Sequence, residues 1–195
     1  MYTVLLDSSN INLSVGVANG DVLLNQISYE AWQQQSEYMI TELNKLLEHF
    51  NIKKEQIDTI MVAVGPGSYT GVRIAITIAK VMALACNAKV YPVSSLRVQK
   101  DAQKPSICII NARSGRSYVG LYEGNKVIKE DAIWQNEEVL EFIKNNPDYV
   151  VCGNTKYLGV EGKENSVIEG MLSLREALEP IDNNLALKPI YMSGN

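Results

Sequence analysis

Three short runs of hydrophobic residues, separated by polar turn residues, open the chain. They cover residues 2–7, 11–18 and 21–28, and the second joint is Asn19-Gly20. The dipeptide Asn-Gly favours a tight two-residue hairpin, because both residues tolerate a positive φ. The pattern therefore predicts an antiparallel meander of three strands.

A change of period follows the meander. Ser36 can cap a helix over residues 36–50, in which six apolar residues recur at helical spacing: Met39, Ile40, Leu43, Leu46, Leu47 and Phe50. Residues 57–64 form a largely apolar run before Gly65, the profile of a strand buried on both faces. Residues 71–87 alternate like a strand at first, but their length and alanine content favour a helix.

The helix predicted over residues 71–87 has a stripe of small residues, Gly71, Ala75, Ala79 and Ala83, at intervals of four. Small residues let another backbone approach closely. Two explanations stay open, which are packing inside the domain and an interface with another subunit. The second would account for a helix with almost no polar side. We assign to such an interface Met39, Leu43, Leu46, Gly71, Ile74, Ala75, Ile78, Ala79, Met82 and Ala83.

The polar run over residues 99–105 is the best candidate for a domain boundary, and divides the chain into residues 1–104 and 105–195. One more strand is predicted before the boundary, over residues 89–93. In the second part, strands are predicted over residues 107–111, 117–123, 126–131 and 148–152, and helices over residues 137–144 and 173–178. Both parts combine a meander with helices. The fold class is therefore α/β, with mixed sheets.

The composition of the chain limits the classes of function that it can have. The 195 residues carry 18 basic and 22 acidic side chains, and the densest basic spot is Lys53-Lys54, so tight unaided binding of nucleic acid is not expected. A single histidine, His49, excludes zinc sites that need paired histidines; it fits the last turn of its helix. We expect no metal bound by this chain.

Cellular location is predicted from the start of the chain, the cysteines and the apolar segments. The chain opens on a strand with no signal peptide, and Arg73 and Lys80 interrupt its most apolar segment, so we expect a cytoplasmic protein with no membrane association. Cys86, Cys108 and Cys152 are far apart in apolar stretches and are expected to be buried free thiols.

The most unusual segment is the glycine-rich run from Gly65 to Arg73, between the buried strand and the helix. Such a turn presents backbone N–H groups that can hold an anion, although its glycine spacing matches no standard nucleotide loop. A tight structural turn is the competing explanation. We place in the candidate site Asp7, Ser8, Ser9, Gly65, Pro66, Gly67, Ser68, Thr70, Gly71 and Arg73.

This loop and helix resemble the signature of the bacterial TsaB (YeaZ) family, which takes part in tRNA threonylcarbamoyladenosine biosynthesis. The resemblance rests on residues 65–73, 76–85 and 93–96, and extends to residues 6–9, 36–37, 46–47, 111–113, 118–119, 121–122 and 189–191. It implies two ribonuclease-H-like lobes of the actin/sugar-kinase/Hsp70 type, the second reduced. It also implies a non-catalytic partner of TsaD, working with the ATPase TsaE.

Further expectations follow from the resemblance. ATP and metal would reside on the partner subunits, with no cofactor bound tightly here, tRNA would be met only through the complex, and the isolated chain would form a homodimer. Two positions depart from the family pattern: Gln35 stands where histidine is common, and Asn111 where aspartate is usual.

Two enzymatic alternatives stay open. An ATP-dependent small-molecule kinase of the same fold would place Asp7 and the Gly65 loop at the phosphates, although Asn111 removes the second carboxylate that such a site needs. A peptidase would need a base for Ser68, and the only histidine is His49. Arg113 and Arg116 also have two possible roles: they are solvated residues of a turn, or they contact a phosphate of tRNA or of a nucleotide.

Overall fold

The computed structural model describes residues 1–31 and 34–192. The chain forms two compact units, Met1–Ser95 with Val167–Ile190, and Leu96–Ser166 with Tyr191 and Met192. The sequence boundary at 104/105 differs from this division in two ways. The change of unit falls at 95/96, and the segment Val167–Ile190 returns to the first unit, where Ile168, Met171 and Leu187 are buried.

The first unit is built on a five-stranded mixed sheet in the order β3-β2-β1-β4-β5. The strands are β1 (Tyr2–Asp7), β2 (Asn12–Asn19), β3 (Val22–Glu30), β4 (Ile57–Ala63) and β5 (Lys89–Val93). β1, β2 and β3 pair antiparallel, which confirms the predicted meander, whereas β4 pairs parallel to both β1 and β5.

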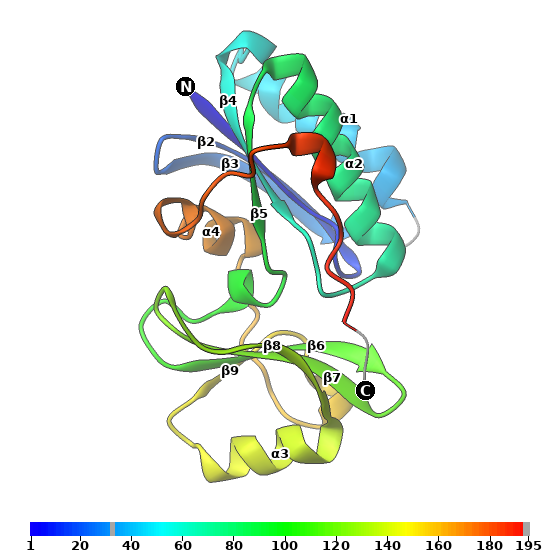
Figure 1. Cartoon of the computed structure of the whole chain (residues 1–195), viewed down its shortest axis with the longest axis vertical. Helices are drawn as coiled ribbons and strands as arrows, with labels where there is room; N and C mark the ends of the chain where they lie inside the picture. The colour runs from blue at the N-terminus through cyan, green and yellow to red at the C-terminus, as the bar shows by residue number, and fades with distance from the viewer. Residues whose placement is uncertain (32–33, 193–195) are drawn as a thin grey trace. The chain divides into compact units, whose positions relative to one another are not determined.

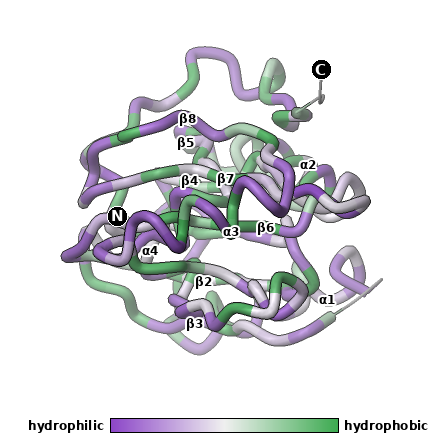
Figure 2. Tube along the Cα trace, turned by 90° about the horizontal axis from the view of Figure 1, so that it is seen from below, coloured by the Kyte–Doolittle hydropathy of each residue, from purple (hydrophilic) through white to green (hydrophobic). Residues whose placement is uncertain are grey.

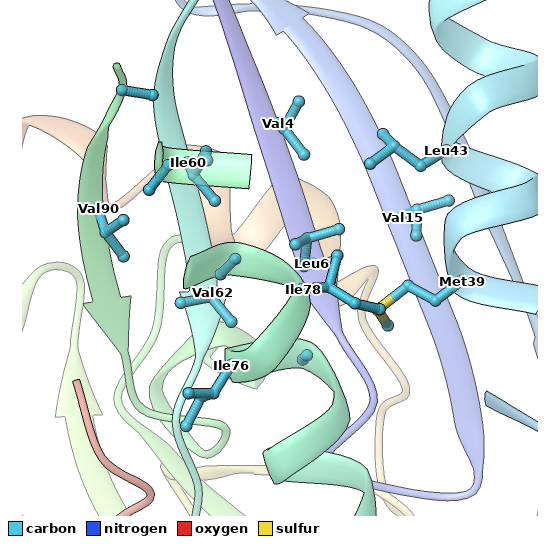
Figure 3. Close-up of a cluster of buried hydrophobic side chains, with 14 of the residues drawn as sticks. Val4, Leu6, Val15, Met39, Leu43, Ile60, Val62, Ile76, Ile78 and Val90 are labelled. Carbon is cyan, nitrogen blue, oxygen red and sulfur yellow. The ribbon is translucent and has the colours of Figure 1, made fainter. Parts of the chain in front are cut away.

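Helices cover both faces of this sheet (Figure 1). α1 (Gln35–His49) packs against β2 and α2 (Tyr69–Cys86) against β4, side by side on one face. α4 (Val167–Leu172) packs against β1 and β2 on the other face. Between the sheet and the α1 and α2 layer lies the main core, in which Met39 and Leu43 meet Leu6 and Val15 (Figure 3).

The helix starts differ from the sequence prediction. Ser36 is not the cap of α1, because the helix begins at Gln35, whose buried side chain donates a hydrogen bond to the carbonyl of Asn10 at 3.2 Å. α2 begins at Tyr69, and Ser68 is its N-cap. His49 does end α1, and its ring packs edge-on against Phe50 with centroids 4.8 Å apart.

α2 is the one helix, within the described residues, that is long and apolar enough to cross a membrane by length and composition. Seven of its residues are buried within the first unit. Its apolar character is therefore that of a core helix packed on a sheet.

The second unit contains a smaller sheet in the order β8-β7-β6-β9. Its elements are β6 (Ser106–Arg113), β7 (Arg116–Glu123), β8 (Lys126–Gln135), α3 (Asn136–Asn145) and β9 (Val150–Cys152). β6, β7 and β8 are again an antiparallel meander, and β9 adds parallel to β6. The arrangement repeats that of the first unit with one strand fewer.

α3 is amphipathic, and hydrophilic and hydrophobic residues alternate along it (Figure 2). Its Val139, Phe142 and Ile143 pack on one face of the smaller sheet, against Ile107 and Ile109. Cys108, Ile110, Tyr122 and Cys152 form a separate cluster with Leu96. Since successive residues of a strand point to opposite faces, this cluster lies on the face of the sheet opposite α3.

The helix predicted over residues 173–178 is wrong. The helical segment is α4, which ends at Leu172, and only a short 3-10 turn, Arg175–Ala177, lies within the predicted range. α4 is held by its buried Ile168 and Met171, three residues apart on one side, and Gly170 between them weakens the sequence signal for a helix.

Candidate functional site

The glycine-rich loop lies directly on the turn that follows β1. The amide of Ser68 donates a hydrogen bond to the carbonyl of Ser9 at 2.6 Å, and the hydroxyl of Ser8 donates to the carbonyl of Gly71 at 2.7 Å. The hydroxyl of Ser68 accepts a hydrogen bond from the amide of Gly71 at 3.2 Å, which caps α2. Two backbone donors of this loop, the amides of Ser68 and Gly71, are thus used inside the protein.

Two glycines of the loop are required by this close approach. A Cβ at Gly67 would overlap the carbonyl of Ser9, and one at Gly71 would overlap the carbonyl of Ser8. Neither obstacle is a flexible side-chain end, so a larger residue would displace backbone. The close packing favours the structural turn that the sequence left open. An anion at this loop stays a prediction.

Asp7 ends β1 beneath the loop. Its carboxylate accepts a hydrogen bond from the amide of Ser9 at 2.7 Å, so it caps its own turn, as the sequence analysis also allowed. The side chain is buried, and desolvation raises the pKa of its carboxyl group above the usual value. No cluster of three histidine, cysteine, aspartate or glutamate side chains that could hold a metal occurs within residues 1–31 and 34–192.

The ten residues predicted for the loop site do not form one surface. Six are buried in the loop and turn, namely Asp7, Ser8, Ser9, Gly65, Pro66 and Gly71, and Gly67 and Ser68 are half-buried. Thr70 and Arg73 instead face solvent from the first turns of α2. The exposed pair lines a different feature, the groove between α1 and α2.

The residues proposed for a partner interface are mostly internal. Eight of the ten are buried within the first unit: Met39, Leu43, Leu46, Gly71, Ala75, Ile78, Ala79 and Ala83. The small-residue stripe of α2 is thus part of the core, because small side chains let the helix lie close to the sheet. Only Ile74 and Met82 are partly exposed, so the predicted interface set requires correction.

An apolar groove does occur beside that stripe. It has a volume of about 360 Å³ and is lined by Ser36 and Ile40 of α1 and by Tyr69, Thr70, Arg73, Ile74, Thr77 and Ile78 of α2. Ile40 is 51% exposed and Tyr69 59% exposed, a degree of exposure that burial in a partner would remove. Arg73 donates a hydrogen bond to the Tyr69 hydroxyl at 2.5 Å and lies over the Tyr69 ring.

The exposed apolar surface continues along α2. Val81 and Leu84 are 61% and 63% exposed, and they follow Ile74 and Thr77 at helical spacing on the same side of α2. We call Ile40, Tyr69, Ile74, Val81 and Leu84 the groove face. The sequence did carry its signal, because a helix that is apolar all round must expose part of that surface when only one side meets the core.

The second candidate contact, at the β6–β7 hairpin, is a tight turn. Arg113 and Ser114 adopt positive φ angles of 64° and 50°, and the side chain of Asn111 accepts a hydrogen bond from the Arg113 amide at 2.8 Å. Asn111 thus supplies the turn with the acceptor that aspartate would provide. Arg113 is exposed and Arg116 half-buried.

Comparison with known proteins assigns the chain to a family. The family model described as "TsaD: tRNA N6-adenosine threonylcarbamoyltransferase" matches residues 27–148, more than half of the chain. The chain belongs to this family. Among its relatives, the chain is a TsaB/YeaZ-type member, as the following matches show.

The tRNA threonylcarbamoyladenosine biosynthesis protein TsaB of Bacillus subtilis is 28% identical over 137 residues, which are 68% of this chain and 60% of that protein. The uncharacterized protein MG208 of Mycoplasma genitalium is 26% identical over 98% of this chain and 94% of its own length. A crystal structure of a protein with similarity to peptidase YeaZ from Pseudomonas aeruginosa has a TM-score of 0.81 at 19% identity, over 98% of this chain and 99% of the other.

These matches confirm the expected fold class and family. The actin-like, ribonuclease-H-like fold agrees with the two meander-based sheets, the second of which is smaller. The kinase alternative receives no support from them. The serine of the peptidase alternative, Ser68, caps α2.

Proposed function

We propose that this protein is a non-catalytic assembly subunit in the threonylcarbamoylation of the adenosine adjacent to the anticodon in tRNA. In this role it binds and supports a TsaD homologue in the cytoplasm, together with the ATPase TsaE. The curated relatives named TsaB act in tRNA threonylcarbamoyladenosine biosynthesis, as their names state. The single observation that carries the proposal is the groove face.

The chemistry of the groove face suits a protein partner. Ile40, Val81 and Leu84 expose large aliphatic side chains, which would leave water on contact with a second protein. Tyr69 and Arg73 add an aromatic ring and a guanidinium group, two side chains that are enriched where protein interfaces carry most of their binding energy. The TsaD homologue is the occupant we assign, and a second copy of this chain would use the same face in the isolated protein.

The residues of the loop support a non-catalytic role. Asp7 is engaged in its own turn, and Asn111, which would be the second carboxylate of a phosphate-transferring site, is an amide. ATP and metal are therefore assigned to the partner subunits. The net charge of −4 and the scattered basic residues agree with tRNA being met only through the complex.

Reconstitution tests the proposal. The chain is mixed with its TsaD and TsaE homologues, threonylcarbamoyl-adenylate and unmodified tRNA, and the modified nucleoside is measured by mass spectrometry. We expect modification with the full set and none when this chain is omitted or used alone. Modification without it, or by it alone, contradicts the proposal.

A substitution in the groove face tests whether this face is the contact with the TsaD homologue. Ile74→Asp is expected to weaken binding of the TsaD homologue by at least about tenfold, because the new charge loses its water in the contact. The matched control is Val22→Asp, a change at a 65% exposed valine on β3. Equal binding by both variants would show that the groove face is not the contact. Loss of homodimer alone, with the TsaD homologue still bound, would assign the groove face to self-association.

A further inference from the structure

Two of the three free cysteines are direct neighbours in the fold, although 43 residues separate them in the chain. Cys108 of β6 and Cys152 of β9 are paired across the parallel strands, and both are fully buried. Their side chains belong to the same cluster on the sheet face opposite α3, and the two thiols are in hydrogen-bond contact. The sequence predicts buried free thiols but contains no signal for this pairing.

The spacing of the strands suits a covalent bond. Neighbouring strands lie about 4.8 Å apart. Disulfides join residues whose Cα atoms are separated by about 4.4–6.8 Å. Cys108 and Cys152 occupy the same register position, so their Cα atoms fall in this window with no change in strand pairing.

The surroundings make the two sulfurs unequal. Burial raises the pKa of the Cys108 thiol well above its usual value. The Cys108 thiol donates to the sulfur of Cys152 and lowers the pKa of Cys152. Burial and the Asp101 carboxylate act in the opposite direction, and the Lys163 ammonium, which is paired with Asp101 at 2.7 Å, lowers that pKa further. The side-chain amide of Asn165 is a further donor to the Cys152 sulfur, at 3.8 Å. The Asn165 amide beside the Cys152 sulfur and the position of Cys152 on the edge strand make it the sulfur assigned to the first attack, with Cys108 as the second sulfur.

Access to Cys152 depends on the edge of the sheet. β9 contains only three residues, Val150–Cys152, and is the edge strand. Its outer side is covered by the segment around Lys163, which makes one isolated bridge with Cys152. Short elements of this kind open locally at much lower free energy than the whole domain, so a small oxidant can reach the sulfur.

We propose that Cys108 and Cys152 form an oxidisable dithiol, which hydrogen peroxide converts into an intramolecular disulfide. In the first step the Cys152 thiolate attacks the peroxide O–O bond; a sulfenic acid forms on Cys152, and water leaves with the thiol proton. In the second step the Cys108 sulfur attacks the sulfenic sulfur, the S–S bond forms, and the displaced hydroxide takes the Cys108 proton as a second water. A thiol reductant reverses the bond by exchange.

Peptide mapping tests this proposal without a functional assay. The folded Cys86→Ser protein, which retains only the pair, is treated with hydrogen peroxide, alkylated and digested with trypsin under non-reducing conditions. We expect residues 101–113 and 145–156 to be recovered as one linked pair of peptides, which separates after reduction. Alkylated thiols on both peptides, or oxidation to sulfinic acids without a link, would overturn it.

Single variants test the order of the two steps. In Cys108→Ser the reaction is expected to stop at a sulfenic acid on Cys152, which dimedone traps. In Cys152→Ser we expect Cys108 to stay reduced under the same treatment. A sulfenic acid trapped on Cys108 instead would contradict the assignment of Cys152 as the attacking sulfur. A link that forms only after addition of denaturant would show that the native pairing plays no part.

Discussion

The amide of Ser68 and the carbonyl of Ser9 are joined by a 2.6 Å hydrogen bond, which fixes the start of α2 to the turn after β1. The bond joins segments that are 59 residues apart in the sequence. It explains why the first half of the glycine-rich loop, Gly65 to Ser68, packs against the turn after β1. A loop with free donors would be suited to an anion, whereas here the amide of Ser68 donates to the neighbouring turn and that of Gly71 donates to the Ser68 hydroxyl.

The first prediction concerns Gly71. Gly71→Ala should destabilise the protein by about 1–3 kcal/mol, because the added methyl group must displace the carbonyl of Ser8 or the start of α2. Chemical denaturation measures the loss. The control is Thr70→Ala, a change at the exposed neighbouring position, which should alter the free energy of unfolding by no more than about 0.5 kcal/mol. Equal stability of the two variants would refute the close approach.

The second prediction separates the two sides of α2. Ala79→Arg should cost about 3–5 kcal/mol of stability, because Ala79 is fully buried and the new charge would have no partner. Val81→Arg changes a position that is 61% exposed and should leave stability within about 0.5 kcal/mol of the original. Thermal unfolding of both variants checks the assignment. If Val81→Arg is the more damaging change, the helix is turned the other way.

The third prediction concerns the carboxyl group of Asp7. Because burial raises its pKa in the folded state, the folded protein binds the proton more tightly than the unfolded chain does. Below the ordinary carboxyl pKa both states are protonated and ionisation contributes nothing to the difference. As pH rises from the ordinary carboxyl pKa to the raised pKa of Asp7, the unfolded chain ionises first and the folded state loses stability; above the raised pKa the loss stays constant.

Asp7→Asn removes that titration and keeps an oxygen that can accept from the Ser9 amide. The variant should therefore gain stability over the original protein as pH rises above the ordinary carboxyl pKa, by an increment that grows until Asp7 of the folded protein ionises and then stays constant. Urea unfolding at several pH values measures the increment. A variant that is less stable at neutral pH would indicate that the charge of Asp7 is stabilised, for example by a bound cation.

The sequence predicted the local elements well and the contacts between them poorly. The strands of both meanders and the helix after the glycine loop follow from period and turn residues alone. α4 was missed because its six residues depend on tertiary packing of Ile168 and Met171. The Cys108 and Cys152 pair could not be predicted, because the parallel pairing of β6 and β9 leaves no spacing rule in the chain.

The candidate site shows the same limit. The sequence identified the right helix for contact but assigned Ala75, Ala79 and Ala83 to the outside, since a stripe of small residues suits a sheet and a partner equally. Which side of α2 faces the sheet depends on how Ser68 caps the helix and on how the loop is anchored to Ser9. Those contacts are long-range, so periodicity alone does not provide them.

The return of Val167–Ile190 to the first unit bears on the order in which the chain can fold. During synthesis, the second unit lacks only Tyr191 and Met192 of its described residues once Ser166 has been added. At that point the first unit still lacks Ile168 and Met171, which are buried on one face of its sheet, and the buried Leu187. Folding of the first unit is therefore completed only after the ribosome has passed the second.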